Sequence, residues 1–391
     1  MRLLILSFYY PPDLSAGSFR TGSLANTLKS KINEDDRVDI VTTFPNRYQS
    51  YNINVSSTEQ VADNINIYRI KLPPHKSGMF DQSLSFFKYF LKSQRLVKRK
   101  NYDMVFATSS RLFTAFLGAS IARKKRIPLF LDIRDIFLDT LNSIMNAWQL
   151  FILKPIIAKI ERLTIKQANH INLVSEGFKD YFIKKYPYKS YSYFTNGIDK
   201  EFLNYDFKKT TDSNKKVITY AGNLGEGQGL HQIVPFLAEY LGNEFEFHIY
   251  GDGGKKNELL QLLEKYQIPN VKIFAPVSRE ELKKIYKESD YLFLHLNDYE
   301  AFRKVLPSKI FEYGATEKPV IAGVSGYSAQ FIKQHLPSWI VFEPTNCADF
   351  KKEFEKDKDS VPDNTLFKKR FNRTNIMNKL VEKVFDTVKD K

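Results

Sequence analysis

A lysine and a glutamate three residues apart begin a segment that predicts a short helix between two turns. Lys309 and Glu312 lie in the stretch VLPSKIFEYGATEKPVIAG, where Ser308 is the expected N-cap. A cation in the first helical turn opposes the helix dipole, so a nearby anion would explain Lys309. The carboxylate of Glu312 could accept hydrogen bonds from two vicinal hydroxyls, such as those of a ribose. The competing interpretation is an exposed Lys309–Glu312 ion pair, worth about 0.2–0.5 kcal/mol.

Glycine-rich segments follow two of the expected strands. The first, YAGNLGEGQGL, contains four glycines: Gly222, Gly225, Gly227 and Gly229. It precedes a helix whose free N–H groups could receive an anion, but it has neither a Walker ending nor the G-x-G-x-x-G spacing of a dinucleotide site. A phosphate site and a simple tight turn both remain open for this loop. The second segment, YGDGGKKNEL, favours a plain connection from strand to helix.

Charged residues also follow an apolar run in the first half of the chain. The stretch LFLDIRDIFLD places Asp132, Arg134 and Asp135 just past an expected strand. Charges this close to an apolar run seldom enter a core unpaired. An internal pair between Arg134 and a carboxylate and a role in ligand binding fit this pattern equally well.

The elements that must position these residues alternate between strand and helix. Strands are expected in the first half at residues 3–7, 38–42, 66–70, 104–107, 129–131 and 170–173, and in the second half at residues 217–221, 246–250, 271–274, 291–295, 320–322 and 339–342. Alternating strands and helices predict an α/β fold with parallel sheets, and two such sets predict two doubly wound Rossmann-like domains. Ligands of such sheets bind outside the carboxyl ends of the strands, where these loops lie.

The domain boundary is expected in the polar stretch DKEFLNYDFKKTTDSNKK. We therefore predict an N-terminal domain at residues 1–205 and a C-terminal domain at residues 206–370. Residues 371–391 belong to an amphipathic helix with no strand after it, and we expect this helix to pack back on the N-terminal domain.

Composition limits the class of protein. The chain is 43% hydrophobic and 14% aromatic, which is enough for real cores and excludes wholesale disorder. The single cysteine, Cys347, excludes a disulfide framework and a cysteine-based metal cluster. The start of the chain, MRLLILSFYYPP, is typical of a first strand rather than a signal peptide. The sequence contains no run of 18 apolar residues, so we expect no membrane-spanning helix.

The net charge of +15 belongs almost entirely to the first half of the chain. Residues 1–200 contain 30 Lys and Arg against 16 Asp and Glu, whereas residues 201–391 contain 29 against 28. An anionic membrane surface, a nucleic acid and a basic surface without a partner are the three interpretations. No helix-turn-helix, zinc or RNA-binding motif favours a nucleic acid, so we expect no nucleic acid partner.

Taken together, the order and spacing of the motifs resemble the retaining glycosyltransferases of the GT-B fold, family 4. The resemblance covers nearly the whole length, through FYYPPDLSAGSFRTGSLANTL, LDIRD, VSEGFKDYF, FTNGIDKEF, YAGNLGEGQGL, IYGDGG and PSKIFEYGATEKPVIAG. It looks closest to the branch that builds bacterial surface polysaccharides, including transferases of N-acetylated deoxyamino sugars. The resemblance implies two domains facing across a cleft, with the acceptor bound by the N-terminal domain and the donor by the C-terminal domain.

The implied activity is the retaining transfer of a hexosyl or N-acetylaminosugar unit from a nucleotide-sugar, with UDP as the expected nucleotide, to a glycan or undecaprenyl-linked acceptor. The implied pathways are capsule and O-antigen (lipopolysaccharide) synthesis. A catalytically weak GT-B-like subunit that binds sugars or acts as a scaffold is the alternative, because part of the family pattern is missing. No cofactor and no metal are expected.

The resemblance also implies site residues. Glu312 matches the ribose-binding glutamate, and Ser308 lies beside it. Gly17 belongs to a loop that approaches the donor phosphate, and Val277 to a segment that would face the base. The residues of the diphosphate loop are Gly222, Asn223, Gly225 and Gln228. Arg134 and Asp135 stand where many members carry a His-Asp pair near the sugar.

The sequence departs from the family pattern at two places. Asn223 and Gln228 stand where many members carry an Arg and a Lys, so Lys309 and Arg20 become the candidates to compensate the diphosphate charge. Lys304 stands where many members carry a second glutamate. No carboxylate pair indicates a covalent intermediate, so we expect front-side attack, with Lys309 and N–H groups stabilising the leaving diphosphate.

Two segments of the basic half predict contact with a membrane surface. MFDQSLSFFKYFLKSQRLVKRK and NSIMNAWQLFILKPIIAKIERL interleave apolar and basic residues. Helices of this kind can lie in a membrane interface, where anionic headgroups add about 1 kcal/mol per nearby cation. The competing interpretation is that both apolar faces pack internally. With the implied acceptor, the pattern predicts a cytoplasmic protein, peripheral at the inner face of the cell membrane.

Overall fold

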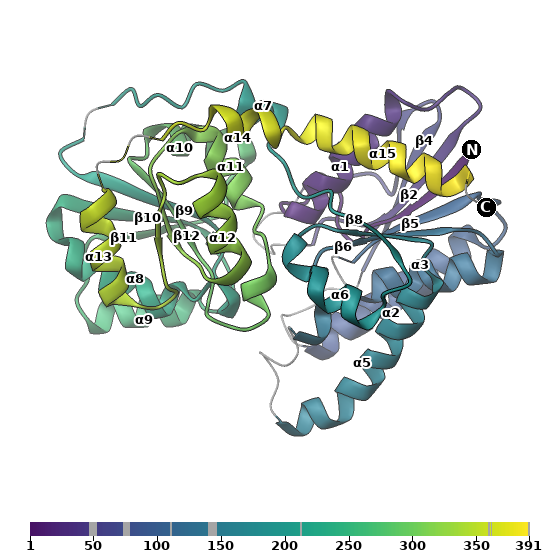
Figure 1. Ribbon diagram of the computed structural model, residues 1–391, viewed down its shortest axis with the longest axis horizontal. Helices are drawn as coiled ribbons and strands as arrows, with labels where there is room; N and C mark the ends of the chain where they lie inside the picture. Colours follow the sequence, from purple (N-terminus) through teal and green to yellow (C-terminus); the bar gives the residue numbers. More distant parts are fainter. Residues whose placement is uncertain are drawn as a thin grey trace. The chain divides into compact units, whose positions relative to one another are not determined.

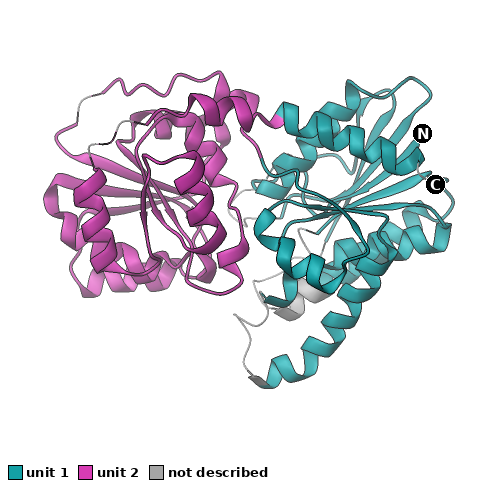
Figure 2. Ribbon diagram, in the orientation of Figure 1, with its two compact units in different colours: residues 1–196, 374–391 teal, residues 197–373 magenta. Residues whose placement is uncertain are grey.

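The computed structural model describes residues 1–46, 53–72, 79–109, 112–139, 147–211, 213–358, 360 and 362–389. The chain forms two compact units: unit 1 comprises Met1–Asn196 and Thr374–Lys391, and unit 2 comprises Gly197–Arg373 (Figure 2). The chain therefore passes between the units twice, after Asn196 and after Arg373. Each unit contains a sheet with helices on both faces (Figure 1).

The sheet of unit 1 has eight strands in the order β3-β4-β2-β1-β5-β6-β7-β8. All neighbouring pairs are parallel except β3 and β4. The strands are β1 (Arg2–Leu6), β2 (Arg37–Thr43), β3 (Thr58–Ala62), β4 (Ile65–Ile70), β5 (Met104–Thr108), β6 (Leu129–Ile133), β7 (His170–Leu173) and β8 (Ser190–Ser192). Most central strand residues are fully buried, as expected for a parallel sheet covered on both faces.

Helices cover both faces of this sheet (Figure 1). They are α1 (Ala16–Lys29), α2 (Met79–Val97), α3 (Leu112–Lys125), α5 (Ala147–Gln167), α6 (Lys179–Lys185) and α15 (Arg373–Lys389). Leu24 and Leu28 of α1 share a core with Leu380 and Val384 of α15. Helices α2, α3 and α5 lie on the opposite face, where α5 packs along α3.

Unit 2 has a six-stranded, fully parallel sheet in the order β11-β10-β9-β12-β13-β14. Its strands are β9 (Lys216–Asn223), β10 (Phe245–Asp252), β11 (Val271–Phe274), β12 (Tyr291–His295), β13 (Val320–Gly323) and β14 (Ile340–Phe342). Its helices are α7 (Lys200–Leu203), α8 (Leu230–Leu241), α9 (Lys256–Lys265), α10 (Arg279–Glu288), α11 (Lys309–Thr316), α12 (Gly326–His335), α13 (Cys347–Asp357) and α14 (Thr365–Arg370). Helices α8, α9 and α13 enclose one core, and α10, α11 and α12 lie on the other face (Figure 1).

The prediction of two doubly wound α/β domains is confirmed, and all twelve predicted strands are present. The sequence pattern missed β3 and β8. Strand β3 has no buried residue and pairs only at the antiparallel edge of the sheet, so it has no apolar signal. Strand β8 is three residues long and rich in serine, which is too short for a pattern.

The chain leaves unit 1 after Asn196, before the boundary at residue 205 that the sequence predicts. Residues 197–205 belong to unit 2 because they make specific contacts there: Ile198 bridges Asn372, and Asp199 pairs with Arg279. The return crossing follows Arg373, so α15 begins in unit 2 and continues in unit 1. Among the helices that the structure describes, none is both long and apolar enough to span a membrane.

Candidate functional site

The glycine-rich loop of unit 2 joins the carboxyl end of β9 to α8. A short 3₁₀ turn, Glu226–Gln228, leads to Gly229, whose φ of 59° lies in the left-handed region that glycine adopts without strain. Polar groups of the segment after β12 bind the loop's carbonyls. The N–H of Asn297 donates to Gly227 O (2.9 Å), and its Nδ2 donates to Glu226 O (3.1 Å).

His295 binds the next carbonyl of the same loop. Its Nδ1 donates to Gln228 O at 2.6 Å, and its Nε2 accepts the N–H of Thr345 at 3.1 Å. The ring is fully buried, and burial lowers the pKa of His295 to about 4. Three consecutive carbonyls, those of residues 226–228, are therefore turned toward β12. Within the turn itself, the N–H groups of Gln228 and Gly229 donate to Gly225 O and Glu226 O, each at 3.2 Å.

The two uncharged residues of this loop bind each other. The Nδ2 of Asn223 donates to Oε1 of Gln228 at 2.7 Å. The hydrogen bond thus joins the two positions at which many family members carry an Arg and a Lys.

Lys309 reaches this loop from the start of α11. Its Nζ lies 4.8 Å from the centre of the Tyr220 ring, on the strand that leads into the loop. A Cβ on Gly222 would collide with the Nζ, and Gly222 has a φ of 151° that residues with side chains rarely adopt. The backbone of Gly222 and the ammonium group of Lys309 are thus packed together, which concentrates positive charge at the loop.

Glu312 lies one turn further along α11, and its side chain is only 12% exposed. Its Oε1 is 3.6 Å from Nη2 of Arg279. Burial raises the pKa of Glu312, and the positive charges of Arg279 and Lys309 oppose that rise. The competing interpretation of an exposed Lys309–Glu312 pair is wrong, because the carboxylate is buried beside an arginine.

Other predicted residues of unit 2 surround this group. Ser308 directly precedes α11, but its side chain makes no capping hydrogen bond, contrary to the sequence prediction, because its backbone is already helical (φ −62°, ψ −26°). Val277 lies half-buried in the segment between β11 and α10. Lys304 is 3.4 Å from the exposed carboxylate of Glu300.

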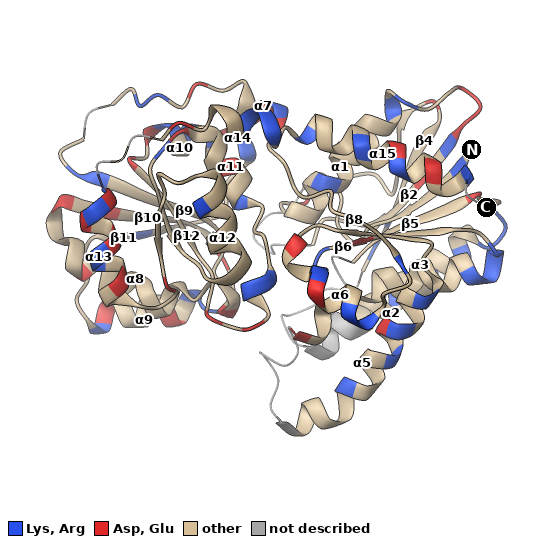
Figure 3. Cartoon of the chain, in the orientation of Figure 1, with Lys and Arg blue, Asp and Glu red and all other residues tan. Residues whose placement is uncertain are grey.

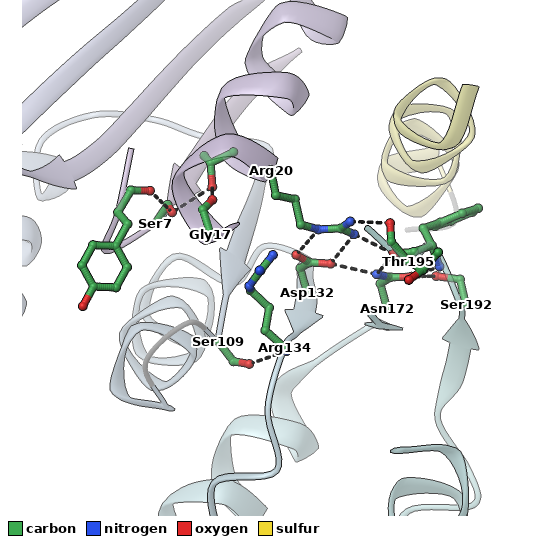
Figure 4. A network of polar contacts seen from close by, with 12 residues as sticks. Ser7, Gly17, Arg20, Ser109, Asp132, Arg134, Asn172, Ser192 and Thr195 are labelled. Carbon is green, nitrogen blue, oxygen red and sulfur yellow. Dashed lines mark hydrogen bonds and ion pairs between the residues drawn. The ribbon is translucent and has the colours of Figure 1, made fainter. Parts of the chain in front are cut away.

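A separate polar network is buried at the corresponding end of the sheet in unit 1 (Figure 4). Arg20 binds both carboxylate oxygens of Asp132, through Nε at 2.8 Å and Nη2 at 2.9 Å. It also donates to the carbonyls of Thr195 (2.7 Å) and Phe194 (2.8 Å). Asn172 donates to the same Asp132 at 2.8 Å. These bonds fix the chain just before it leaves unit 1.

Arg20 is therefore not placed as the sequence predicts. Its side chain is 3% exposed and its N–H groups are directed to Asp132 and the two carbonyls. The guanidinium is needed there to compensate the buried carboxylate. Arg20 therefore stabilises the buried polar network of unit 1 and is not a candidate to compensate a diphosphate.

The remaining predicted residues of unit 1 lie at strand ends near this network. Gly17 is buried in the first turn of α1, which Ser15 caps by accepting the N–H of Ser18 (3.2 Å). The N–H of Arg134 donates to Ser109 Oγ at 2.9 Å (Figure 4). Asp135 is exposed and lines a small cavity of about 20 Å³ together with Ser109, Phe137 and Glu161.

Two family sequence models match the chain on either side of the first crossing. The model described as Glycosyltransferase Family 4 matches residues 23–202, and the one described as Glycosyl transferases group 1 matches residues 201–364. The chain belongs to the family 4 glycosyltransferases. The resemblance that the sequence motifs indicated is thereby confirmed, and unit 2 corresponds closely to the group 1 match.

Similar proteins agree with this family. The colanic acid biosynthesis glycosyl transferase WcaI of Escherichia coli (strain K12) is 33% identical over 97 residues, which is 25% of this chain and 24% of that protein. The match thus spans about a quarter of the length of that relative. Among solved structures, sucrose-phosphate synthase from Thermosynechococcus elongatus has 11% identity and a TM-score of 0.77, covering 100% of this chain and 99% of its own.

Two further structures have the same architecture. Anabaena Alr3699/HepE, solved in complex with UDP, has 15% identity and a TM-score of 0.67, covering 99% of this chain and 100% of its own. WaaG, a glycosyltransferase involved in lipopolysaccharide biosynthesis, has 12% identity and a TM-score of 0.63, covering 100% and 96%. At these identities the likeness shows the fold alone, which is GT-B.

Within the described part of this glycosyltransferase, the sequence missed three residues that contact the glycine-rich loop or Glu312. His295 and Asn297 hold the carbonyls of the loop, and Arg279 contacts Glu312. The signal for the first two was present, since HLND begins at the last residue of a fully buried strand. Arg279 carries no such signal, because it is one of seven charged residues in the ten-residue helix REELKKIYKE.

Proposed function

We propose that this glycosyltransferase moves a sugar from a nucleotide-sugar, UDP-linked, to a hydroxyl of a glycan or undecaprenyl-linked acceptor, with retention of configuration. The sugar is a hexosyl or N-acetylaminosugar unit. The pathway is the synthesis of a bacterial surface polysaccharide such as capsule or O-antigen. The observation that carries this proposal is the packing of the Lys309 ammonium against Gly222, one helical turn from the buried carboxylate of Glu312.

Each of these groups has a distinct task. Glu312 accepts hydrogen bonds from the two ribose hydroxyls of the donor. Lys309 and the N–H groups of the glycine-rich loop stabilise the negative charge that the diphosphate gains as the sugar leaves. The departing phosphate oxygen takes the proton of the acceptor hydroxyl, which attacks from the same face. The proposal requires no resident cofactor or metal, because the protein's own cation and N–H groups meet this charge.

The names of the relatives support the pathway. WcaI is named for colanic acid biosynthesis, and WaaG for lipopolysaccharide biosynthesis. HepE was solved with UDP. These names support a nucleoside diphosphate as the leaving group of the donor. They also support a surface polysaccharide as the product.

A transfer assay tests the proposal. Purified protein is incubated with a panel of nucleotide-sugars and bacterial lipid extracts as acceptors, and the product linkage is determined by NMR. We expect release of the nucleoside diphosphate with transfer of the sugar, and the donor's anomeric configuration in the product. An inverted product would overturn the retaining mechanism. Tight donor binding without transfer in any extract would favour the alternative, a subunit that binds sugars without catalysis.

Contact with an anionic membrane surface belongs to the same proposal. Helix α5 carries apolar side chains on two opposite faces. Ile157 and Ile165 are buried against the rest of unit 1, whereas the other face has four exposed side chains at helical spacing: Trp148 (71% exposed), Phe151 (79%), Ile152 (45%) and Ile156 (51%). Internal packing, the competing interpretation, accounts for the first face but not for the second.

Cations accompany this apolar face. Lys154, Lys159 and Arg162 are exposed on α5 itself, and exposed Lys88, Lys92 and Arg95 accompany exposed Leu84 and Phe87 on α2 (Figure 3). Apolar side chains with surrounding cations suit the headgroup region of an anionic bilayer. The proposed location is accordingly peripheral, at the cytoplasmic face of the cell membrane, where an undecaprenyl-linked acceptor would be met.

Vesicle flotation tests this contact. We expect the wild type to float with vesicles that contain anionic lipid, to float less with neutral vesicles, and Phe151→Asp to remain in the pellet fraction. Phe236→Asp, which changes a 49% exposed phenylalanine of unit 2, is the matched control and should float like the wild type. Equal flotation of both variants would contradict the proposal. The proposal would also be contradicted if the wild type formed a dimer that Phe151→Asp dissociates, because the exposed face of α5 would then join two copies of the chain.

A further inference from the structure

Arg279 contacts the carboxylates of three residues. It is the first residue of α10 and follows directly after the segment that holds Val277. Its Nη2 lies 2.7 Å from Asp199 Oδ2 and 3.6 Å from Glu312 Oε1, and its Nε lies 3.0 Å from Glu201 Oε1. The side chain is 16% exposed and its guanidinium lies 5.0 Å from the centre of the Phe202 ring. The group is therefore fixed from several sides.

Asp199, the nearest of these partners, is itself anchored. Arg373 places Nε 3.0 Å from Asp199 Oδ1, and it also donates to the carbonyl of Gly197 at 2.7 Å. The 2.7 Å contact with Asp199 fixes the guanidinium of Arg279, whose distance to the Glu312 carboxylate is longer, at 3.6 Å. At 3.6 Å, the positive charge of a guanidinium orients a carboxylate, but the distance is too long for a hydrogen bond. The carboxylate oxygens therefore remain able to accept other donors.

We propose that Arg279 is a positioning residue for the nucleotide: it orients the Glu312 carboxylate and keeps it ionised, so that both oxygens can accept ribose hydroxyls. This inference rests on the proposed function, because it assumes that Glu312 binds a ribose. It adds a residue that touches no ligand in this scheme and acts only through Glu312.

The charges around Glu312 support this role. The titratable groups that face it come from several elements: Arg279 of α10, Lys309 and Tyr313 of α11, Tyr286 of α10, Asp199 before α7 and Arg373 at the start of α15. Burial raises the pKa of Glu312, and Arg279 is the strongest of the cations that lower it. Without Arg279, more of the carboxyl is protonated at neutral pH, and a protonated carboxyl accepts fewer hydrogen bonds.

The test is UDP affinity, measured by calorimetry from about pH 6 to about pH 9 with the wild type, Arg279→Gln and Arg279→Lys. We expect Arg279→Gln to bind about tenfold more weakly near pH 7, the scale of one hydrogen bond to a charged group. This loss should shrink as pH rises, because Glu312 then ionises without help. Arg279→Lys should restore part of the affinity. Arg370→Gln, a change at an exposed arginine of unit 2, should match the wild type.

The outcomes separate this inference from the proposed function. If the wild type does not bind UDP, the proposed function fails. If the wild type binds UDP and Arg279→Gln binds equally well, or more weakly by one constant factor at every pH, the inference about Arg279 is overturned. Where Arg279→Gln reduces the folded fraction, Arg279→Lys decides: a loss that recovers with pH supports the inference, and wild-type affinity throughout overturns it.

Discussion

The ammonium group of Lys309 occupies the space where a side chain on Gly222 would begin. Its Nζ lies 4.8 Å from the centre of the Tyr220 ring, and Gly222 itself has a φ of 151°. The loop after β9 has no cation at Asn223 or Gln228, and these two side chains bind each other. The charge that this loop lacks is therefore supplied by a lysine from a different element, and the glycine is what lets that lysine approach.

Gly222→Ala should damage the enzyme almost as much as Lys309→Ala, although it removes no charged group. The new Cβ would displace the Lys309 ammonium from the loop and strain the backbone. We expect turnover to fall by about 10²-fold in either variant, the scale on which loss of one charge-stabilising donor acts. The measurement is kcat for sugar transfer. Gly254→Ala is the matched control, because a Cβ there meets no atom within 4 Å; equal kcat in all three variants would disprove this role of Gly222.

Arg20→Ala should destabilise the protein without changing how it recognises a nucleotide. It leaves the carboxylate of Asp132, which is 1% exposed, without its bidentate partner. Removal of one member of a buried pair costs about 3–5 kcal/mol of unfolding free energy, which urea denaturation measures. Lys31→Ala removes an exposed partner of Glu382 and should cost about 0–1 kcal/mol. A stable Arg20→Ala variant with strongly weakened UDP binding would instead restore Arg20 as a ligand of the diphosphate.

The buried His295 should make the fold sensitive to mild acid. Its ordinary pKa of 6.5 is lowered to about 4 by burial, so below pH 6.5 the unfolded chain binds a proton that the folded chain does not. The stabilisation is fully present above pH 6.5 and is lost as pH falls toward 4. We expect His295 to account for about 2–3 kcal/mol of unfolding free energy lost by about pH 4.5.

Comparison of unfolding at neutral and acid pH checks this value. His295→Gln keeps a donor and an acceptor but cannot gain the proton, so its unfolding free energy should fall less with acid than that of the wild type. His170 of unit 1 has a pKa lowered to about 4, chiefly by burial, and it should contribute to the acid sensitivity that the variant retains. Identical pH dependence in the variant and the wild type would show that His295 does not titrate in this way.

The alternation of apolar and amphipathic segments was enough to predict both sheets, because every central strand is buried and therefore apolar. It could not predict β3, whose residues are all partly or fully exposed. For the site, each motif alone left a plain structural interpretation open, and only the order and spacing of the motifs together predicted roles for Glu312, Lys309 and the glycine-rich loop. The partner of Arg20 could not be predicted, because Asp132 is 112 residues away and only the parallel order of β1, β5 and β6 brings the two together.

The same limit applies to the groups that support the site. His295 reaches a carbonyl 67 residues earlier in the chain, and Arg279 reaches Glu312 from another helix. These contacts depend on the order of strands in the sheet rather than on local pattern. Motif spacing identified the residues proposed to touch the donor, whereas the residues that hold them in place required the structure.

The central claim is that unit 2 binds the nucleotide part of the donor through Glu312. The most direct measurement is a calorimetric titration of the wild type and Glu312→Ala with UDP at neutral pH. We predict that the wild type binds UDP, and that Glu312→Ala binds at least about tenfold more weakly because two hydrogen bonds to a charged acceptor are lost. Equal affinity in the two proteins would contradict the account.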